Sequence, residues 1–513
     1  MNKRLALAVA AVEALLAAVV GLFFSQVILI SLAVSLVICA YLLFVIKKNF
    51  ATEQQNNDRV STLAKGRRNG RIRVPFSLVF VTALAIPSGY SIYHAALNPS
   101  PEAVYSVAIS FGIGMTFLFS MINLPLSIYH KIREKSIPNP TVTPLISVIV
   151  PAYNEELLIS RTIESLLESS YPSKEIIIVD DGSTDRTQSI ALAYETKNAE
   201  KANTGTRVIV AKKENGGKAS AINYGLHFAT GEIVIIVDAD SIIGREALFE
   251  MIKHFSDPTV AAVGGNVRVM NRWNLITKCQ ALEYITGINL LKRAFDYLGV
   301  VMIVPGALGA FRKSALVERG SYDTDTLTED FDATLKVLKS GNTVQASSEA
   351  LSYTEAPTTL KDLYKQRLRW NRGNLQTMIK HRDIMRNPRL GMLHDFGYPA
   401  VLLTMLLSPF LGMMVTGFTI LALIDGMWQF VLLSFLLFAG IQAAFSAIAL
   451  VMEENEDWKL LLYSPLFVIG YKQLQDYIII KSIIDVVFKK NLKWTSVKRS
   501  GVIRKQKASS EAA

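Results

Sequence analysis

The chain has very few of the residues that build disulfide frameworks and zinc sites. Among 513 residues there are two cysteines, Cys39 and Cys279, too few for a disulfide framework or a cysteine-rich zinc site. The six histidines show no HExxH motif and no other paired-ligand spacing. The sequence also has no internal repeat and no low-complexity segment. Any metal that the protein binds is therefore expected to be held by oxygen ligands.

Positive charge is in excess, but its distribution argues against a nucleic-acid partner. The net charge is +11, and much of the excess lies in a loop at 47–74 and in a tail at 489–513. Both segments flank apolar runs, which is where the positive-inside rule places cytoplasmic residues. Membrane lipid is therefore an expected partner. The basic residues concerned are Lys47, Lys48, Arg59, Lys65, Arg67, Arg68, Arg71, Arg73, Lys489, Lys490, Lys493, Lys498, Arg499, Arg504, Lys505 and Lys507.

Long apolar runs predict an N-terminal membrane region at 1–136. Half of all residues are hydrophobic (50%), and the mean hydropathy is +0.30. Residues 5–46 are long enough for two spans of about 20 residues each, and 75–96 and 103–128 add two more. An alternative for residues 1–24 is a signal peptide, but the run is overlong and no clear small-x-small cleavage site closes it. Four spans place the following domain in the cytoplasm, and the predicted location is a multi-pass protein of the cell membrane.

A second membrane region is predicted at 398–488. Its apolar stretches are 398–424, 428–452 and 459–488. The third stretch reads as one helix interrupted by Pro465, Lys472 and Asp476, although a cytoplasmic tail requires an even number of crossings. Two alternatives stay open at this point: the third stretch is a kinked crossing plus an interfacial piece, or an earlier run does not span fully.

Between the membrane regions the sequence is typical of a soluble α/β domain. Short β-branched runs (ISVIV, EIIIV, RVIVA and EIVIIV) alternate with helical patterns, which predicts βαβ units and a mostly parallel sheet at 140–357. Three of these strands end in polar sequences: VPAYNEE at 150–156, VDDGSTD at 179–185 and VDAD at 237–240. Ligands of open α/β sheets bind beyond the carboxyl ends of the strands, so the candidate site lies there.

Asp238 and Asp240 are the candidate metal ligands. Their spacing of two places both carboxylates on the same side of an extended strand end, and hard cations such as Mg²⁺ or Mn²⁺ prefer oxygen ligands. A DxD sequence alone is a weak signal, because most such pairs are loop carboxylates or caps; its position at the end of a buried strand favours the metal.

Other polar residues have two readings each. Asp180 and Asp181 either form a turn or bind a base or ribose, and the second reading is favoured. Lys218, after a Gly-Gly turn, is either solvated or a nucleotide contact. Glu329 either completes a capping box with Thr326 or joins Asp330, a candidate general base that takes a proton from an attacking hydroxyl.

The stretch YKQRLRWNRG, at 364–373 in a segment of predicted interfacial amphipathic helices (358–397), combines four cations with a tryptophan. Gln366, Arg369 and Trp370 fall on one helical face, and Arg367 and Arg372 are expected to point elsewhere, as on a lipid-surface helix. Cationic donors suit a diphosphate leaving group, and an indole ring suits stacking on a sugar. We expect the helix both to lie on the membrane and to bind substrate.

Together, VPAYNEE, DDGSTD, DAD, TED and QRLRW resemble the motifs of the processive family 2 glycosyltransferases, which include cellulose synthase, hyaluronan synthase and bacterial poly-N-acetylglucosamine synthases. The likeness covers about residues 140–500, and the segments 265–284 and 304–316 look most like the poly-N-acetylglucosamine branch. The four apparent N-terminal spans depart from the two that are typical of that branch. The resemblance implies a glycosyltransferase-A-like domain embedded between membrane helices.

The resemblance also implies roles for individual residues. Nucleotide and donor binding would fall to Tyr153, Glu155, Asp180, Asp181, Lys218, Asp238, Gln366 and Arg369. Asp238 and Asp240 would face the diphosphate and its Mg²⁺ or Mn²⁺. Asp330, with Glu329 beside it, would be the catalytic base. The acceptor would meet Trp370, Gly306 and Ala307, and a tail motif adds Trp494 and Thr495.

The function so implied is an inverting, processive β-glycosyltransferase that polymerises UDP-N-acetylglucosamine into an exported polysaccharide. Its expected partners are the UDP-sugar, the growing polysaccharide, membrane lipid and a small accessory membrane subunit. The alternatives are a cellulose- or hyaluronan-synthase-like polymerase and a non-processive lipid glycosyltransferase. A nucleotide-binding transporter is the alternative from another class, but the apolar runs carry few ionisable residues, Glu13 and Asp476, that could form a relay.

Overall fold

The computed structural model describes residues 99–140, 142–200 and 205–489, with four isolated positions at 89, 93, 96 and 97. The predicted spans at 5–46, most of 75–96, the basic loop 47–74, and Trp494 and Thr495 lie outside the described residues. The chain divides into two compact units, Met1–Ile132 with Leu406–Tyr477 and Arg133–Met405 with Ile478–Ala513.

The second unit is built on one eight-stranded sheet with the order β3-β2-β1-β4-β7-β6-β8-β5. The strands are β1 Ile146–Ala152, β2 Lys174–Asp180, β3 Thr206–Lys212, β4 Ile233–Ile236, β5 Ser241–Ile243, β6 Val260–Val269, β7 Gly309–Arg312 and β8 Thr343–Thr354. The four strands predicted from the sequence are confirmed as β1 to β4, and they are parallel to one another. The sheet as a whole is mixed, because β7 is antiparallel to β4 and β6, and β5 is antiparallel to β8.

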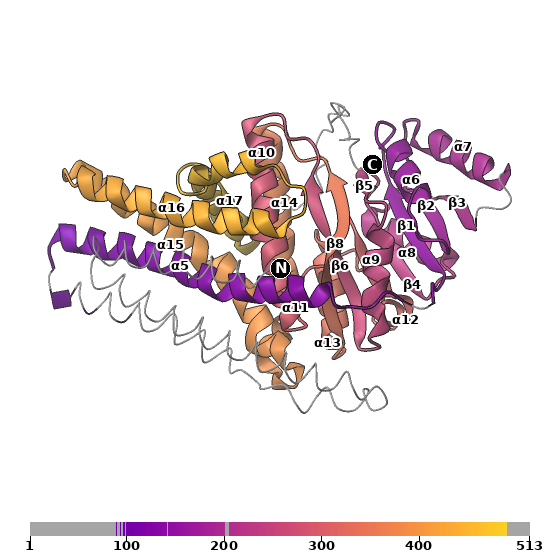
Figure 1. The fold of residues 1–513 in the computed structure, drawn as a ribbon, viewed down its shortest axis with the longest axis horizontal. Coiled ribbons are helices and arrows are strands. Elements are labelled where there is room, and N and C mark those ends of the chain that lie inside the picture. Colours follow the sequence, from indigo (N-terminus) through magenta and orange to yellow (C-terminus); the bar gives the residue numbers. More distant parts are fainter. Residues whose placement is uncertain are drawn as a thin grey trace. The chain divides into compact units, whose positions relative to one another are not determined.

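Helices cover both faces of this sheet (Figure 1). Strand residues alternate between the two faces, so Val148 and Val150 join one apolar cluster and Ile149 joins the other. The first cluster packs against α6 Ile159–Leu167, α7 Thr187–Glu200 and α9 Ala247–Ile252. The second packs against α8 Lys218–Phe228, α12 Lys313–Val317, α13 Glu329–Lys339 and α14 Leu360–Lys380.

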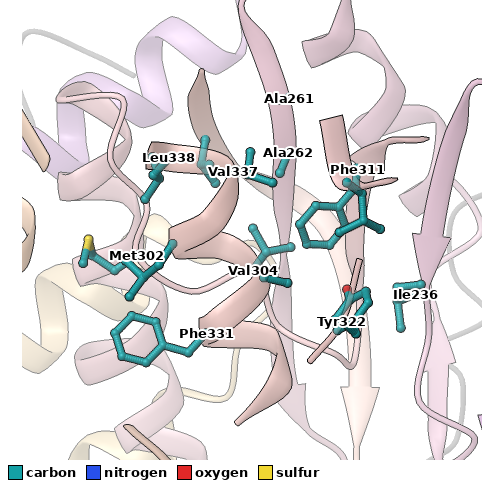
Figure 2. Packing of buried hydrophobic residues seen from close by; sticks show 14 of the residues in the cluster. Ile236, Ala261, Ala262, Met302, Val304, Phe311, Tyr322, Phe331, Val337 and Leu338 are labelled. Carbon is teal, nitrogen blue, oxygen red and sulfur yellow. The ribbon is translucent and has the colours of Figure 1, made fainter. Parts of the chain in front are cut away.

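The second cluster is what holds α13 on the sheet. Figure 2 shows Phe331 and Val337 of α13 in one apolar layer with Val304 and Phe311. The remaining helical elements of this unit are α10 Leu275–Glu283, a π-helix Tyr284–Asn289, α11 Leu290–Tyr297, a π-helix Leu393–Gly397, and 3₁₀ turns Lys253–Ser256, Arg382–Arg386 and Pro388–Leu390.

The apolar segments form helices, and two of those described are long and apolar enough to cross a membrane, Leu393–Ile424 and Trp428–Met452. The helices are α5 Pro101–Glu134, α15 Tyr398–Ile424, α16 Trp428–Met452 and α17 Tyr471–Val487. The third C-terminal stretch is not one helix: a 3₁₀ helix, Trp458–Phe467, precedes α17, and the chain turns at Gly470, whose φ is +99°. Such a φ favours glycine over any residue with a Cβ.

Close contact between α8 and the sheet depends on a glycine, which gives a first prediction. A Cβ at Gly225 would lie 2.7 Å from Cγ2 of Ile149 and 3.1 Å from Cγ2 of Val179, in a core that has no room for it. We expect Gly225→Ala to lower the free energy of unfolding by about 1–3 kcal/mol through overpacking, measured by denaturation of the purified protein. The control is Gly417→Ala on α15, where nothing lies within 4 Å of the added carbon. An equal effect of both substitutions would contradict the packing argument.

Candidate active site

The polar strand ends meet at one edge of the sheet, as the sequence predicts. Ala152, the last residue of β1, pairs in register with Asp180, the last of β2. The backbone N–H of Asp181 donates to the carbonyl of Ala152, and that of Val237 donates to Ile149. The side chain of Asn154 then accepts a hydrogen bond from the backbone N–H of Thr184 at 2.9 Å, which joins the loops after β1 and β2. Sequence reasoning did not single out Asn154.

Asp181 organises the loop that leads into α8. Its buried carboxylate accepts hydrogen bonds from the Nζ of Lys213 at 2.7 Å and from the backbone N–H groups of Gly216 at 3.0 Å and Gly217 at 2.8 Å. Asp180 is buried as well; its Oδ1 accepts from Ser183 N at 3.3 Å, whereas its Oδ2 has no hydrogen-bond partner. A buried acceptor without a hydrogen-bond partner is a candidate for a ligand contact. Nucleotide binding therefore remains the prediction for Asp180 and Asp181.

Lys218 connects two acidic groups from distant parts of the chain. Its Nζ lies 2.5 Å from Oδ1 of Asp238 and 3.1 Å from Oε1 of Glu329. Burial opposes the charge of the ammonium group, but the carboxylates of Asp238 and Glu329 outweigh it and raise the pKa of Lys218. The reading of Lys218 as a solvated lysine is therefore wrong, while its role as a nucleotide contact remains a prediction.

Gly306 makes room for this ion pair. A Cβ at position 306 would lie 2.4 Å from Nζ of Lys218 and 3.4 Å from Oδ1 of Asp238. The next residue, Ala307, accepts a hydrogen bond from the hydroxyl of Ser352 through its carbonyl at 3.0 Å. Gly306 thus lies beside Asp238, and Ala307 follows it on the loop before β7.

Asp330 lies in the first turn of α13, where the predicted capping box does not form. The helix begins at Glu329 with Thr328 as its N-cap, and no side-chain hydrogen bond caps it. The hydroxyl of Thr326 has no hydrogen-bond partner, and Glu329 pairs with Lys218 instead. Burial and the neighbouring Glu329 raise the pKa of Asp330 from 3.8 to about 6, although Lys218 opposes the shift. A carboxylate with this pKa is ionised at neutral pH and is basic enough to accept a proton.

The helix with the QRLRW sequence, α14, packs directly against the start of α13. A Cβ at Gly373 would lie 2.9 Å from the backbone nitrogen of Thr328, and the hydroxyls of Thr328 and Thr377 are 3.2 Å apart. Gln366 is buried and Trp370 is partly exposed. Asp330 and the QRLRW residues therefore lie on two helices, α13 and α14, that pack against each other.

The two arginines expected to point away from the substrate face form internal contacts. The guanidinium of Arg367 lies 4.3 Å from the ring centre of Trp370 and donates a hydrogen bond to Glu283 at 2.7 Å. Arg372 pairs with the buried carboxylate of Asp485 on α17. The expectation that Arg367 and Arg372 lie on a lipid-facing surface is therefore wrong, because both form internal ion pairs. The sequence gave no signal that Glu283 and Asp485 would be their partners.

Asp238 and Asp240, the predicted metal ligands, lie after the end of β4. Asp240 is buried, and the side chain of Asp238 is partly exposed next to Lys218. Within the described residues, no group of three or more His, Cys, Asp or Glu side chains is arranged to hold a metal ion. Two carboxylates fit a Mg²⁺ or Mn²⁺ ion only if substrate oxygens supply further ligands, which is how such ions bind nucleotide phosphates.

A cavity of about 490 Å³ lies elsewhere in the same unit. Its lining includes Lys174 and Thr206, the first residues of β2 and β3. It is therefore at the amino ends of the parallel strands, opposite the polar edge, and we do not assign the chemistry to it.

Comparison with known proteins agrees with this geometry. Residues 147–320 match the family described as Glycosyl transferase family 2. This segment is similar to family 2 glycosyltransferase domains. The chain is 34% identical over 236 residues to poly-beta-1,6-N-acetyl-D-glucosamine synthase of Staphylococcus aureus (strain COL) and 35% identical over 236 residues to that of Staphylococcus epidermidis. The match covers 46% of this chain and 56% of each relative. The resemblance proposed from the motifs is confirmed, and the similarity supports a glycosyltransferase as the class of enzyme.

The domain that matches this family has a mixed sheet. Among solved structures, the chain is similar to a mannosyltransferase from Pyrobaculum calidifontis in complex with GDP-Man and Mn²⁺, with 21% identity, a TM-score of 0.49, and coverage of 74% of this chain and 99% of that one. It is also similar to Staphylococcus aureus TarS, with 21% identity, a TM-score of 0.32, and coverage of 47% and 40%. These TM-scores are too low to assign the ligands or the metal of those structures to this chain.

The raised pKa of Asp330 predicts a pH-dependent effect on stability. The folded protein disfavours the charged form of this carboxyl group. Below the ordinary pKa of 3.8 the group is neutral whether the chain is folded or unfolded, and it does not lower the free energy of unfolding. As the pH rises through about 6, the group ionises in the folded protein as well, and it lowers the free energy of unfolding. We expect Asp330→Asn, which stays neutral, to unfold at a higher temperature than the natural protein at pH 8 and at the same temperature near pH 4. Thermal unfolding at both pH values tests this, and a difference independent of pH would contradict it.

Proposed function

We propose that the protein is a membrane-embedded, inverting and processive β-glycosyltransferase that polymerises N-acetylglucosamine from UDP-N-acetylglucosamine. The observation that carries the proposal is the position of Lys218 between Asp238 and Glu329, at 2.5 and 3.1 Å. This contact brings the carboxylate at the end of β4 and the helix start that carries Asp330 into one site. A donor held at the sheet edge would thus lie beside the proposed base, which is partly buried.

In the proposed reaction, Asp330 takes the proton of an acceptor hydroxyl as that oxygen attacks the anomeric carbon of the donor. The bond from that carbon to the diphosphate breaks in the same displacement, and UDP leaves. A single displacement inverts the anomeric configuration. Gln366 and Arg369 stabilise the charge that develops on the diphosphate, and Trp370 stacks on the acceptor ring. Tyr153, Glu155, Asp180, Asp181 and Lys218 form the nucleotide side.

A divalent cation completes the proposed donor site. Asp238 and Asp240 would hold Mg²⁺ or Mn²⁺ together with diphosphate oxygens. When bound, the ion neutralises part of the negative charge of the diphosphate leaving group. Lys218 pairs with Asp238, one of these two carboxylates, and would contribute positive charge near the leaving group.

The membrane location extends the proposal to export. Support comes from the apolar helices Leu393–Ile424 and Trp428–Met452 and from the basic segments at 47–74 and 489–513. In this arrangement the glycosyltransferase domain is cytoplasmic, the growing polysaccharide is the acceptor, and it leaves through the membrane region. A small accessory membrane subunit belongs to the proposal as a partner.

The experiment that tests the proposed function is UDP release from purified membranes. UDP-N-acetylglucosamine, UDP-glucose and UDP-glucuronate are offered separately with Mg²⁺ or Mn²⁺. We expect sustained release with UDP-N-acetylglucosamine and a glycosidase-sensitive product of high mass. Asp330→Asn should reduce turnover by at least about 10²-fold, the lower range for loss of a general base, while UDP still binds.

Each other outcome points elsewhere. UDP release with UDP-glucose would indicate a cellulose-synthase-like enzyme. A requirement for two different donors would indicate a hyaluronan-synthase-like enzyme. A product of a single added sugar would indicate a non-processive lipid glycosyltransferase. Release that survives Asp330→Asn would overturn the proposed mechanism.

Metal dependence is tested without turnover. We expect Mn²⁺ with UDP to bind the natural protein, and Asp240→Asn to weaken Mn²⁺ binding by about tenfold or more, since it removes one of only two protein ligands. The measurement is electron paramagnetic resonance of free Mn²⁺, and the control is Asp257→Asn, on the loop before β6. Removal of divalent ions with a chelator should also stop UDP release. Unchanged Mn²⁺ affinity in Asp240→Asn would exclude this carboxylate as a ligand.

A further inference from the structure

Arg367 is the most enclosed cation of the QRLRW sequence, and the proposed reaction does not use it. It is only 3% exposed. Its guanidinium donates to Oε2 of Glu283 at 2.7 Å and to Oε1 of Gln366 at 3.2 Å. It lies over two aromatic rings, 4.3 Å from the centre of Trp370 and 5.7 Å from that of Tyr284.

Burying an arginine is unfavourable unless its charge and its hydrogen bonds are satisfied. Here the carboxylate of Glu283 supplies the charge, and the flat faces of two rings accept the planar guanidinium. Arginine is suited to this position because its group is planar, always charged and able to stack, whereas the compact ammonium of lysine cannot cover a ring. The contacts thus select arginine and not only a positive charge.

The same side chain connects α14 to a different part of the site. Glu283 ends α10, and Tyr284 begins the π-helix Tyr284–Asn289; short π-helical segments are frequent at functional sites. Burial raises the pKa of Tyr284, the guanidinium of Arg367 opposes that shift, and the carboxylate of Asp240 adds to it. Tyr284 is therefore an electrostatic neighbour of both Arg367 and Asp240.

We propose that Arg367 is a positioning residue for the acceptor: it covers one face of the Trp370 indole and leaves the other face for a sugar ring. The inference rests on the proposed function, because it needs Trp370 to bind the acceptor. An indole has two faces, and the guanidinium occupies one of them.

The test compares Arg367→Lys with the natural protein in two binding measurements. The first is a fluorescence titration with a β-1,6-linked N-acetylglucosamine oligosaccharide, with Trp370→Phe to identify the signal of Trp370. The second is calorimetric binding of UDP. We expect Arg367→Lys to weaken oligosaccharide binding by about tenfold, the upper range for a desolvated cation–π contact, and to leave UDP affinity within about twofold.

Two further variants separate positioning from stability. Glu283→Gln keeps the shape of the partner and leaves the guanidinium over the indole, so its effect on oligosaccharide binding should be smaller than that of Arg367→Lys. Lys365→Gln removes a charge from the exposed side of the same helix, where Lys365 lies 4.0 Å from Asp362, and should change neither affinity. Thermal unfolding of each variant identifies any that fails to fold.

Unchanged oligosaccharide affinity in Arg367→Lys, or an equal loss of oligosaccharide and UDP affinity, would overturn the inference. The inference would also be overturned if the natural protein bound the oligosaccharide without a change in the fluorescence of Trp370. Failure of the proposed function looks different: no donor would support UDP release, while binding that depends on Trp370 and Arg367 would persist.

Discussion

The ion pairs of Lys218 are the constraint on which the candidate site depends. Asp238, Glu329 and Asp330 come from two separate elements, and like charges in a buried place repel one another strongly. The ammonium group between Asp238 and Glu329, at 2.5 and 3.1 Å, offsets that repulsion. Gly306 provides the space for it, and Asp181 shapes the turn that precedes it. Without this cation, the carboxylates after β4 and at the start of α13 would repel one another, although apolar packing holds the helix on the sheet.

A second constraint is the packing of α14 against α13. Gly373 lets the two helices approach at Thr328, immediately before Glu329 and Asp330. Arg372 ties the same helix to Asp485 on α17, and Arg367 ties it to Glu283 on α10. The QRLRW residues are therefore held from three directions. A site that binds a sugar ring against an indole needs this rigidity, because a small displacement of a reacting group greatly reduces the rate.

Much of the central domain could be predicted from local pattern. The β-branched runs of β1 to β4 are short, apolar and separated by helical segments, and this pattern is sufficient to predict parallel strands with polar ends at one edge. The antiparallel part was not predicted, because β7 is only four residues, Gly309–Arg312, and carries no periodicity to read. The sequence left the form of the third C-terminal stretch open, because composition presents it as one apolar run and does not show that a turn at Gly470 divides it.

The sequence by itself determined where the acidic groups lie along the chain and that they gather beyond the strands, because strand direction and side-chain alternation follow from residue type. Only the tertiary structure decided which charges meet. Glu329 is spaced correctly for a capping box, yet it faces Lys218, and Arg367 leaves the surface for Glu283, 84 residues away. The physical reason is that a buried charge takes the partner that packing brings within reach, and packing between distant helices is not encoded in the spacing of either one.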